Sequence, residues 1–237
     1  MEEKELKTSV KQRIFIITIA VIMLGSVIAS YVAIVASGSK SSTETGIDEA
    51  TLARYTEEYS KELAEFEELT SGDFATFKNY MGEVRTYDEE AANSNGVYSR
   101  DLLEGSGREI AEGDTDYLAY YVGFCADGSV FDSSLNSTTE PTAFTKAIDA
   151  SLGMIEGWGT AIVGMKLGGV RKMTIPGEQA YGEQMEICGG YNKPLRFLVM
   201  AVAKEDPLKT AASEVDTAYM KLQYAYYGID YDKQMGS

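Results

Sequence analysis

One uninterrupted apolar run constrains this chain more than any other feature of its sequence. Residues 14–36 read IFIITIAVIMLGSVIASYVAIVA and include no charged side chain. As a helix, these 23 residues would be about 35 Å long, which is enough to cross the roughly 30 Å hydrocarbon core of a bilayer. The run therefore predicts an N-terminal transmembrane helix that serves as a signal anchor.

The residues beside the run predict its orientation. Basic residues are concentrated before it: Lys4, Lys7, Lys11 and Arg13 precede the run, and Lys40 alone follows closely. The positive-inside bias then places residues 1–13 in the cytoplasm and the rest of the chain outside. A cleaved signal peptide is the main alternative, because Val35-Ala36-Ser37 offers small residues for cleavage. Its apolar region would normally span only about 7–15 residues. A buried core helix is the third interpretation.

Composition excludes several functional classes. The 237 residues include 37 Asp and Glu against 21 Lys and Arg, a net charge of −16. Such a surface repels phosphate backbones, so we expect no nucleic-acid partner. The chain contains no histidine, which removes Ser-His-Asp and Cys-His catalysis and histidine-ligated metals. Its two cysteines are too few for a cysteine-rich zinc site. We therefore expect neither a metal nor a cofactor.

A linker and an acidic helical extension follow the apolar run. Residues 37–46 are rich in Ser, Thr and Gly, which is typical of a flexible linker. Within 47–95, apolar residues recur at helical spacing at Leu52, Tyr55, Tyr59, Leu63, Phe66 and Leu69. Ser71-Gly72-Asp73 predicts the end of this helix. A second helix is expected to carry Phe74, Phe77, Met81, Val84 and Tyr87, and the polar segment 88–96 to form turns.

The sequence pattern of residues 96–205 is typical of an α+β domain with an antiparallel sheet. Continuous apolar runs at Leu118–Val122 and Phe197–Val202 predict buried strands, and alternation at Val170–Ile175 predicts a half-exposed one. One short helix is expected at Gly157–Met165. Residues 206–237 predict a C-terminal helical extension, with a stripe at Leu208, Ala211, Ala212, Val215, Ala218, Tyr219, Leu222, Ala225 and Tyr226.

An ordered series of short motifs runs through the same region. In chain order they are Gly113-Asp114-Thr115, Tyr120-Tyr121-Val122-Gly123, Asp127–Ser134 (DGSVFDSS), Ile155-Glu156-Gly157-Trp158, Val163-Gly164-Met165-Lys166-Leu167-Gly168, Thr174-Ile175-Pro176, Ala180-Tyr181-Gly182 and Leu195-Arg196-Phe197. The series resembles an FKBP-type peptidyl-prolyl isomerase domain over roughly residues 96–205. The resemblance implies a strongly bent antiparallel sheet wrapped around one short helix.

The resemblance also implies a site. It is an apolar cup between sheet and helix, with Trp158 as its floor and five walls at Tyr121, Phe131, Ile155, Tyr181 and Phe197. Asp132 lines the same pocket. By the same resemblance, the Ile155 backbone N–H and the Tyr181 hydroxyl hydrogen-bond substrate carbonyls. Taken singly, each aromatic residue is more typical of ordinary core packing, and Asp132 could be a turn former; only the ordered set of motifs favours the pocket.

This chemistry suits a chain without histidine. Rotation about a peptide bond meets a barrier of about 18–20 kcal/mol because of amide resonance. The twisted prolyl amide is less polar than the planar one, so an apolar cup binds it preferentially without proton transfer. We therefore expect an isomerase acting on proline-containing polypeptides as they fold outside the cytoplasm. The alternative is a non-catalytic FKBP-fold binding or assembly module of a membrane complex. Two departures from the family pattern motivate it. Thr142 follows Pro141 where the resemblance implies an aromatic residue, and the flap loop at 183–194 is unusual.

Three further questions stay open in the sequence. Cys125 and Cys188 are expected as free thiols, with a disulfide as the alternative that an oxidising compartment permits. The acidic run Glu57, Glu58, Glu62, Glu65, Glu67 and Glu68 favours a solvated helix face over a surface for basic clients or cations. The two helical stripes pack on each other, on the isomerase domain, or on a second copy in a homodimer; some extracytoplasmic relatives dimerise through N-terminal helices.

Overall fold

The structure, a computed structural model, describes residues 47–205 and 207–235. These residues form two compact units. The larger is Glu57–Tyr219, and the smaller contains the described parts of Met1–Thr56 and Met220–Ser237. The predicted anchor at 14–36 and linker at 37–46 lie outside the described residues. Among the helices that are described, none is long and apolar enough to cross a membrane.

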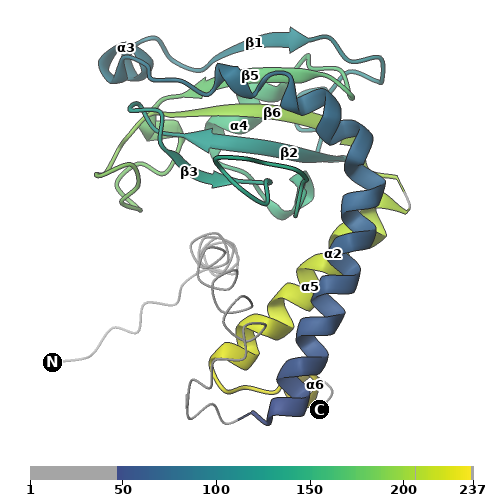
Figure 1. The fold of residues 1–237 in the computed structure, drawn as a ribbon. Helices are drawn as coiled ribbons and strands as arrows, with labels where there is room; N and C mark the ends of the chain where they lie inside the picture. Colours follow the sequence, from purple (N-terminus) through teal and green to yellow (C-terminus); the bar gives the residue numbers. More distant parts are fainter. Residues whose placement is uncertain (1–46, 206, 236–237) are drawn as a thin grey trace, which may run out of the picture. The chain divides into compact units, whose positions relative to one another are not determined.

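An antiparallel sheet forms the centre of the larger unit (Figure 1). Its strands are β1 (Tyr98–Leu103), β2 (Tyr117–Phe124), β3 (Val130–Ser133), β4 (Ile148–Asp149), β5 (Val170–Ile175) and β6 (Leu195–Ala203). Their order is β1-β5-β6-β2-β3, and β4 pairs with β2 outside this path. The predicted α+β class is confirmed, as are the strands expected around Leu118–Val122 and Phe197–Val202.

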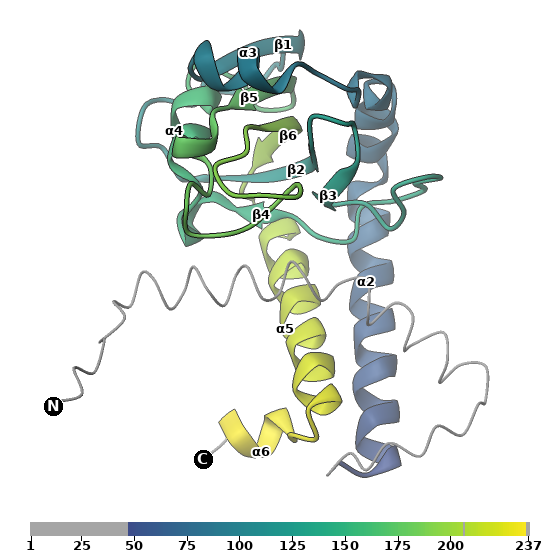
Figure 2. The same cartoon turned by 90° about the vertical axis from the view of Figure 1, so that its left-hand side faces the viewer.

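Helices cover both faces of this sheet. The α-helices are α2 (Glu49–Lys78), α3 (Glu89–Ser94), α4 (Glu156–Ile162), α5 (Leu208–Tyr226) and α6 (Tyr231–Met235). Three short 3₁₀ helices are η1 (Met81–Glu83), η2 (Ala150–Leu152) and η3 (Gly177–Gln179). Figure 2 shows the sheet with α4 on one side and the upper part of α2 on the other. The short helix expected at Gly157–Met165 is α4, which ends three residues earlier.

The two central strands divide their side chains between two cores. Successive side chains of a strand point to opposite faces. In β2, Tyr117, Ala119 and Tyr121 join the core beneath α4. Leu118, Tyr120 and Val122 join the core beneath α2 and α5. All eight residues of β2 are buried, which explains why both faces of the strand are apolar.

The flanking helices are part of the core on the face opposite α4. Three α2 aromatics, Phe66, Phe74 and Phe77, and three α5 residues, Ala211, Ala212 and Val215, pack there against the sheet. Phe144 lies at the centre of this cluster. Its ring stacks on Tyr120 with centroids 4.1 Å apart, and Phe74 and Phe77 meet its edges at 5.4 and 5.3 Å. Phe66 of the first predicted stripe and Ala211, Ala212 and Val215 of the second therefore pack on the sheet of their own chain.

The predicted helix stop at Ser71-Gly72-Asp73 is wrong, because α2 continues to Lys78. Thr70 is buried and its hydroxyl donates to the Phe66 carbonyl, and Phe74 is buried one turn later. This burial outweighs the weak helix propensity of a single glycine, roughly 1 kcal/mol. The buried face of α2 also differs from the predicted stripe, because Leu69, which was expected to be buried, is 49% exposed. A second long helix does not form, and Met81–Glu83 is only a 3₁₀ turn.

Two further predictions are corrected by the fold. Segment 88–96 contains α3 rather than turns alone, because the Asp88 carboxylate caps it by accepting a hydrogen bond from the Ala91 N–H at 2.7 Å. β5 is not half-exposed. Five of its six residues are buried, because the strand lies between β1 and β6 with a helix-covered core on each face.

The smaller unit has its own set of contacts around Tyr55. This buried side chain donates a hydrogen bond to Asp230 at 2.9 Å and accepts one from the Asp232 backbone N–H at 3.2 Å. Arg54 pairs with Asp232 at 2.8 Å. These contacts fasten α6 to the first turns of α2.

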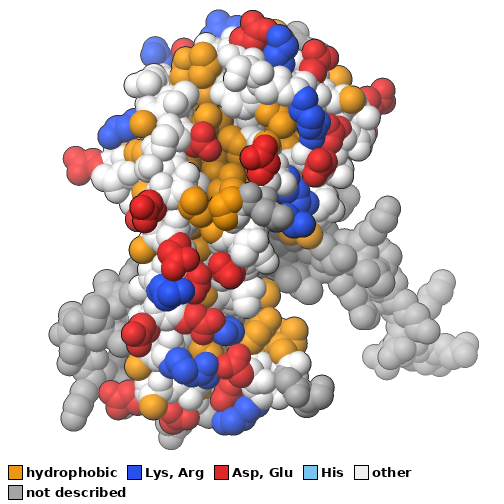
Figure 3. All heavy atoms as spheres, turned by 90° about the vertical axis from the view of Figure 1, so that its right-hand side faces the viewer, with side chains coloured by type: hydrophobic (Ala, Val, Ile, Leu, Met, Phe, Trp, Pro, Cys, Tyr) orange, Lys and Arg blue, Asp and Glu red, His pale blue; other side chains and the backbone are white. Residues whose placement is uncertain are grey.

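One face of the molecule shows acidic and basic side chains interspersed. On the face drawn in Figure 3, acidic and basic side chains alternate around a central group of hydrophobic ones. The net charge of −16 is therefore not gathered into one patch on that face.

Candidate active site

Trp158 forms the floor of an aromatic cluster between α4 and the sheet. The side chain is only 2% exposed. Its ring lies 5.3 Å from Phe197 on β6 and 6.3 Å from Tyr121 on β2, measured between centroids, and meets both nearly edge-on. Its indole N–H donates to the Tyr117 hydroxyl at 3.1 Å. Trp158 therefore touches both central strands of the sheet.

Two glycines give the cluster its shape. Gly157 lets α4 approach β5, since a Cβ there would lie 2.4 Å from the side chain of Ile175. Gly123 leaves room for the ring of Phe131, which a Cβ would meet at 2.6 Å. Phe131, on β3, is half-buried and lies edge-on to Phe197 with centroids 5.7 Å apart. The Phe131 ring thus stands as a side wall open to solvent on one face.

A carboxylate completes this wall. Asp132 follows Phe131 on β3, and its side chain is 8% exposed. It accepts hydrogen bonds from the Tyr121 hydroxyl, from the Ser133 backbone N–H at 2.9 Å and from the Lys146 ammonium at 2.9 Å. Burial raises the pKa of Tyr121 well above its usual value, and the Asp132 charge adds to the effect. The Tyr121 hydroxyl is therefore a permanent donor at neutral pH.

Tyr181 and Ile155 contribute the remaining walls. Both are half-buried and pack against the same core as Trp158. Burial, with a smaller contribution from the Asp132 charge, raises the pKa of Tyr181 to about 12. This hydroxyl is thus also protonated at neutral pH. Ile155 is the residue at the N-terminal boundary of α4.

The structure brings all seven residues named from the sequence together. Six belong to one core or pack against it: Tyr121, Phe131, Ile155, Trp158, Tyr181 and Phe197. Asp132 joins them through Tyr121. Lys146 is the residue that sequence reasoning missed. A lone lysine in the stretch between Phe144 and β4 carries no motif, and the ion pair forms only when this stretch meets β3.

The expectation of free thiols is wrong, because Cys125 and Cys188 form a disulfide with Cα atoms 5.5 Å apart. Cys125 follows β2 directly, and Cys188 lies in the flap loop beside Ile187. Ile187 and Cys188 both pack against the core that contains Trp158. This packing brings residues 63 apart in sequence within the range that a disulfide can bridge. The bond ties the flap loop to the end of β2.

The segment after Pro141 supplies no aromatic side chain to the cup. Thr142 is exposed, and its hydroxyl accepts a hydrogen bond from the Asn136 side-chain amide at 2.8 Å. Phe144 belongs to the opposite core, where it stacks on Tyr120. The cup therefore has no aromatic wall from this segment.

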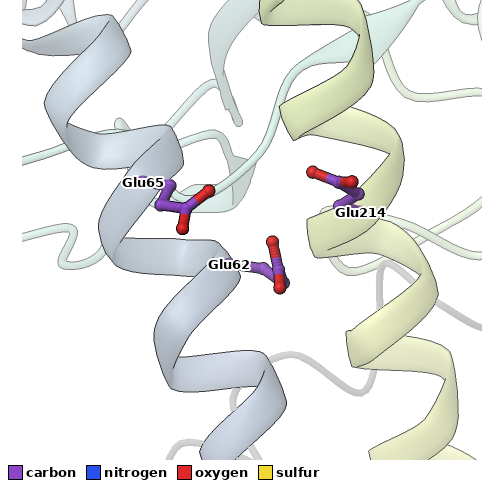
Figure 4. Close-up of side chains that lie close together, drawn as sticks. All are labelled: Glu62, Glu65 and Glu214. Carbon is purple, nitrogen blue, oxygen red and sulfur yellow. The ribbon is translucent and has the colours of Figure 1, made fainter.

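A separate group of carboxylates lies between α2 and α5. Glu62, Glu65 and Glu214 point into the space between the two helices (Figure 4), with ligand atoms within 4.8 Å of one another. Lys61 pairs with Glu62 at 2.9 Å and with Glu65 at 3.3 Å. Glu65 and Glu214 are exposed. These contacts are what a solvated acidic helix face presents.

Known proteins match the sheet domain. The model of the family described as FKBP-type peptidyl-prolyl cis-trans isomerase matches residues 107–200. A protein named FK506-binding protein from Neisseria meningitidis serogroup B is 36% identical over 107 residues, which are 45% of this chain and 92% of that protein. The chloroplastic peptidyl-prolyl cis-trans isomerase FKBP17-1 of Arabidopsis thaliana is 38% identical over 96 residues, 39% of this chain and 42% of that protein. Among solved structures, FkpA from Escherichia coli aligns at 27% identity over 59% of this chain and 62% of that one, with a TM-score of 0.37. The chain belongs to the family of FKBP-type peptidyl-prolyl cis-trans isomerases.

Proposed function

We propose that the cup around Trp158 catalyses rotation about X–Pro bonds in proteins that fold outside the cytoplasm. One observation carries the proposal: four rings, from Tyr121, Phe131, Trp158 and Phe197, converge on a single site beside the nearly buried carboxylate of Asp132. An X–Pro bond exchanges between isomers in about tens of seconds or longer without a catalyst. A site that binds the twisted amide can therefore accelerate this exchange.

The mechanism is preferential binding of the twisted amide. Twisting removes resonance between nitrogen and carbonyl and makes the group less polar. Water solvates the planar form better, whereas the rings of Trp158, Phe197 and Phe131 favour the twisted form. Transfer of the prolyl ring from water into this cup therefore lowers the barrier, and no proton has to move.

Hydrogen bonds to the substrate backbone hold the proline of the substrate in position over the cup. The Tyr181 hydroxyl and the Ile155 backbone N–H are the proposed donors to carbonyl groups next to the proline. Tyr181 is suited to this role, because its pKa of about 12 keeps the hydroxyl protonated. Fixing the flanking carbonyls reduces the loss of entropy on reaching the transition state.

The test is a cis-to-trans assay of a proline-containing tetrapeptide with the full chain in detergent. Acceleration above the thermal rate, lost on addition of a competing prolyl peptide, supports the proposal. A folded protein without acceleration contradicts it. The assay should include both flanking helices, because α2 and α5 supply part of the core on the face opposite α4.

The second candidate is a binding or assembly module without catalytic activity. The exposed Thr142 and the location of Phe144 in the opposite core favour it, since the cup lacks one aromatic wall. Such a module would bind prolyl peptides and leave their isomerisation rate unchanged. Measuring peptide binding by Trp158 fluorescence alongside the rate separates the two functions.

Activity is expected to be nearly independent of pH between about 5.5 and 8.5. The hydroxyls of Tyr181 and Tyr121 both have raised pKa values, so neither ionises in this window. The chain has no histidine, the side chain that ordinarily titrates there. The measurement is kcat/KM against pH, with near-ultraviolet circular dichroism as a control for folding. A bell-shaped profile centred near neutrality would contradict catalysis by desolvation.

We further propose that residues 14–36 anchor the chain in a membrane, with the isomerase domain outside the cytoplasm. The support is the uncharged apolar run with basic residues before it. The Cys125–Cys188 disulfide is consistent with an oxidising compartment. On this proposal, residues 1–13 are cytoplasmic, 37–46 link the membrane to the acidic extension of 47–95, the isomerase domain spans 96–205, and 206–237 form the C-terminal extension.

Protease added outside intact cells should digest the chain after Ala36 and leave a tag on residues 1–13 intact. The positive-inside bias gives this orientation. The measurement is a blot against tags at both ends, in cells stripped of any outer barrier, with a cytosolic protein as the control for lysis. Protection of the C-terminal tag under these conditions would overturn the orientation.

A homodimer through the flanking helices stays a prediction. The side chains of Phe66, Phe74 and Phe77 of α2 are already packed in the core of their own chain. A dimer would therefore have to use other surfaces of the helices. Sedimentation of the full chain in detergent measures the stoichiometry.

A further inference from the structure

The end of α5 and the short helix α6 carry a concentration of exposed apolar side chains. Nine large hydrophobic residues of the described chain are exposed, and five of them are scattered along residues 69–191. The other four lie within ten residues of one another and are here called the end surface: Tyr226 is 41% exposed, Tyr227 60%, Ile229 41% and Met235 62%. The rings of Tyr226 and Tyr227 are in contact, with centroids 5.3 Å apart. Scattered apolar residues are normal on a protein surface, whereas a group of them indicates an interaction site.

The turn that follows α5 holds these side chains in fixed positions. Gly228 adopts a φ of 74°, which closes the helix as glycine commonly does. Its N–H donates to the Ala225 carbonyl at 2.9 Å, and the Ile229 N–H donates to the Tyr224 carbonyl at 2.9 Å. The exposed residues after Ala225 therefore belong to a hydrogen-bonded helix end rather than to a frayed tail.

The end surface lies beside the start of α2, where α6 is fastened (Figure 1). Asp230 accepts a hydrogen bond from the Tyr55 hydroxyl at 2.9 Å, and the Asp232 N–H donates to the same hydroxyl at 3.2 Å. Arg54 adds an ion pair with Asp232 at 2.8 Å. Both Arg54 and Tyr55 lie in the first two turns of α2. The end surface is therefore attached to the part of α2 that follows the linker in the chain.

The length of this linker limits how far the end surface can be from a membrane. Residues 37–46 separate the proposed anchor, which ends at Ala36, from the start of the smaller unit. Ten residues span at most about 36 Å when fully extended. With residues 14–36 in a bilayer, the start of α2 stays close to the bilayer surface.

Charge distinguishes the two units. Residues 57–219 contain 29 Asp and Glu against 13 Lys and Arg, a net charge of −16. The described residues of the smaller unit contain four acidic and three basic side chains, a net charge of −1. All three basic side chains form ion pairs, with either Asp230 or Asp232. Tyrosine, with an apolar ring and a polar hydroxyl, is enriched where a membrane meets water. A nearly neutral surface rich in tyrosine therefore suits the headgroup region of a bilayer.

We propose that the end surface docks on the extracytoplasmic leaflet of the membrane that holds the anchor. Tyr226, Tyr227, Ile229 and Met235 would enter the headgroup region and leave the charged larger unit in water. The inference goes beyond isomerisation and rests on the proposed anchor at 14–36. Four side chains suffice for docking, because the tether keeps the end surface at a high effective concentration next to the bilayer.

The experiment places a fluorescent reporter in the end surface. The full chain is reconstituted in vesicles of phosphatidylcholine with or without bromine on the acyl chains, since bromine quenches tryptophan fluorescence on contact. Tyr227→Trp carries the reporter. Tyr98→Trp on β1 is the matched control, because Tyr98 is a tyrosine of the larger unit that is 55% exposed. The wild-type chain gives the baseline emission of Trp158, which is 2% exposed.

The reporter in the end surface alone should be quenched. A docked ring lies about 5–10 Å into the boundary of headgroups and acyl chains, so the emission added by Tyr227→Trp should fall about twofold or more in brominated lipid. The emission added by Tyr98→Trp should stay unchanged. Equal quenching of the two reporters, or of neither, would overturn the inference. Far-ultraviolet circular dichroism of each variant establishes that it is folded.

A second reporter tests whether the apolar side chains make the contact. Met235→Trp should also be quenched, and the added substitutions Tyr227→Ser and Ile229→Ser should restore its emission. Quenching that persists in this triple variant would attribute the proximity to the tether alone and contradict docking. Emission of Tyr227→Trp that is unquenched and shifts to the blue as the protein-to-lipid ratio rises would assign the end surface to a second copy of the chain. That result would also overturn the inference.

Failure of the anchor is distinguishable from failure of docking. Flotation of the vesicles after an alkaline wash reports on the anchor. A chain that does not float with the vesicles would remove the anchor and the docking proposal together. A chain that floats while Tyr227→Trp stays unquenched would remove docking only. Neither measurement depends on isomerase activity, so the proposed catalytic function is tested separately.

Discussion

Trp158→Ala is expected to lower the free energy of unfolding by about 3–5 kcal/mol and to abolish measurable isomerase activity. Replacing a buried tryptophan with alanine removes apolar contacts and leaves a cavity. Here the substitution also removes the ring contacts of Trp158 with Phe197 and Tyr121 and leaves the Tyr117 hydroxyl without its indole donor. The measurements are urea unfolding followed by circular dichroism and the tetrapeptide assay at a temperature where the variant is folded.

Two further substitutions separate the floor of the cup from the stability of the core. Trp158→Leu keeps an apolar side chain and should fold, but should bind prolyl peptides more weakly and show reduced kcat/KM. Tyr117→Phe removes only the hydroxyl that accepts from the indole, so it should lose about 0.5–1.5 kcal/mol of stability and keep its activity. Wild-type activity in Trp158→Leu would mean that Trp158 is a core residue alone.

Phe77→Ala is expected to destabilise the larger unit by about 3–5 kcal/mol, although Phe77 lies outside the segment that matches the family. The Phe77 side chain is fully buried and meets the edge of Phe144, which stacks on Tyr120 of β2. For a unit of this size the loss corresponds to a fall in the unfolding midpoint of about 6–20 °C. Thermal unfolding of the full chain measures it.

The matched control is Leu69→Ala on the same helix. Leu69 is largely exposed, so its truncation should change stability by no more than about 0.5 kcal/mol. Below the unfolding midpoint, Phe77→Ala should retain kcat/KM within about twofold, because its side chain packs on the face of the sheet opposite the cup. Equal effects of Phe77→Ala and Leu69→Ala would show that α2 is not part of the folding core.

The sheet and the cup could be predicted because their signals are local or ordered along the chain. Runs such as Leu118–Val122 are apolar at every position, as a strand with both faces covered must be. The order of the motifs around Phe131, Trp158 and Tyr181 indicated one pocket. Its aromatic residues do converge, and the structure confirms that proximity while their catalytic roles stay proposals.

The continuation of α2 was decided by packing between distant segments. Gly72 carries a local stop signal, and the burial of Thr70 and the packing of Phe74 against the sheet outweigh it. The same holds for Phe144. Its spacing from Pro141 suggests a place near the cup, whereas contacts with Tyr120 and with the aromatic side chains of α2 hold it in the opposite core.

The sequence by itself indicated the class of fold and the two central strands, because these depend on periodicity. The resemblance carried by its short motifs indicated the aromatic residues of the cup. Only the tertiary structure decided that Cys125 bonds Cys188 and that Lys146 pairs with Asp132. Both contacts require two segments to come within a few ångströms. That distance is a property of the packed chain, and neither a lone lysine nor a pair of cysteines encodes it locally.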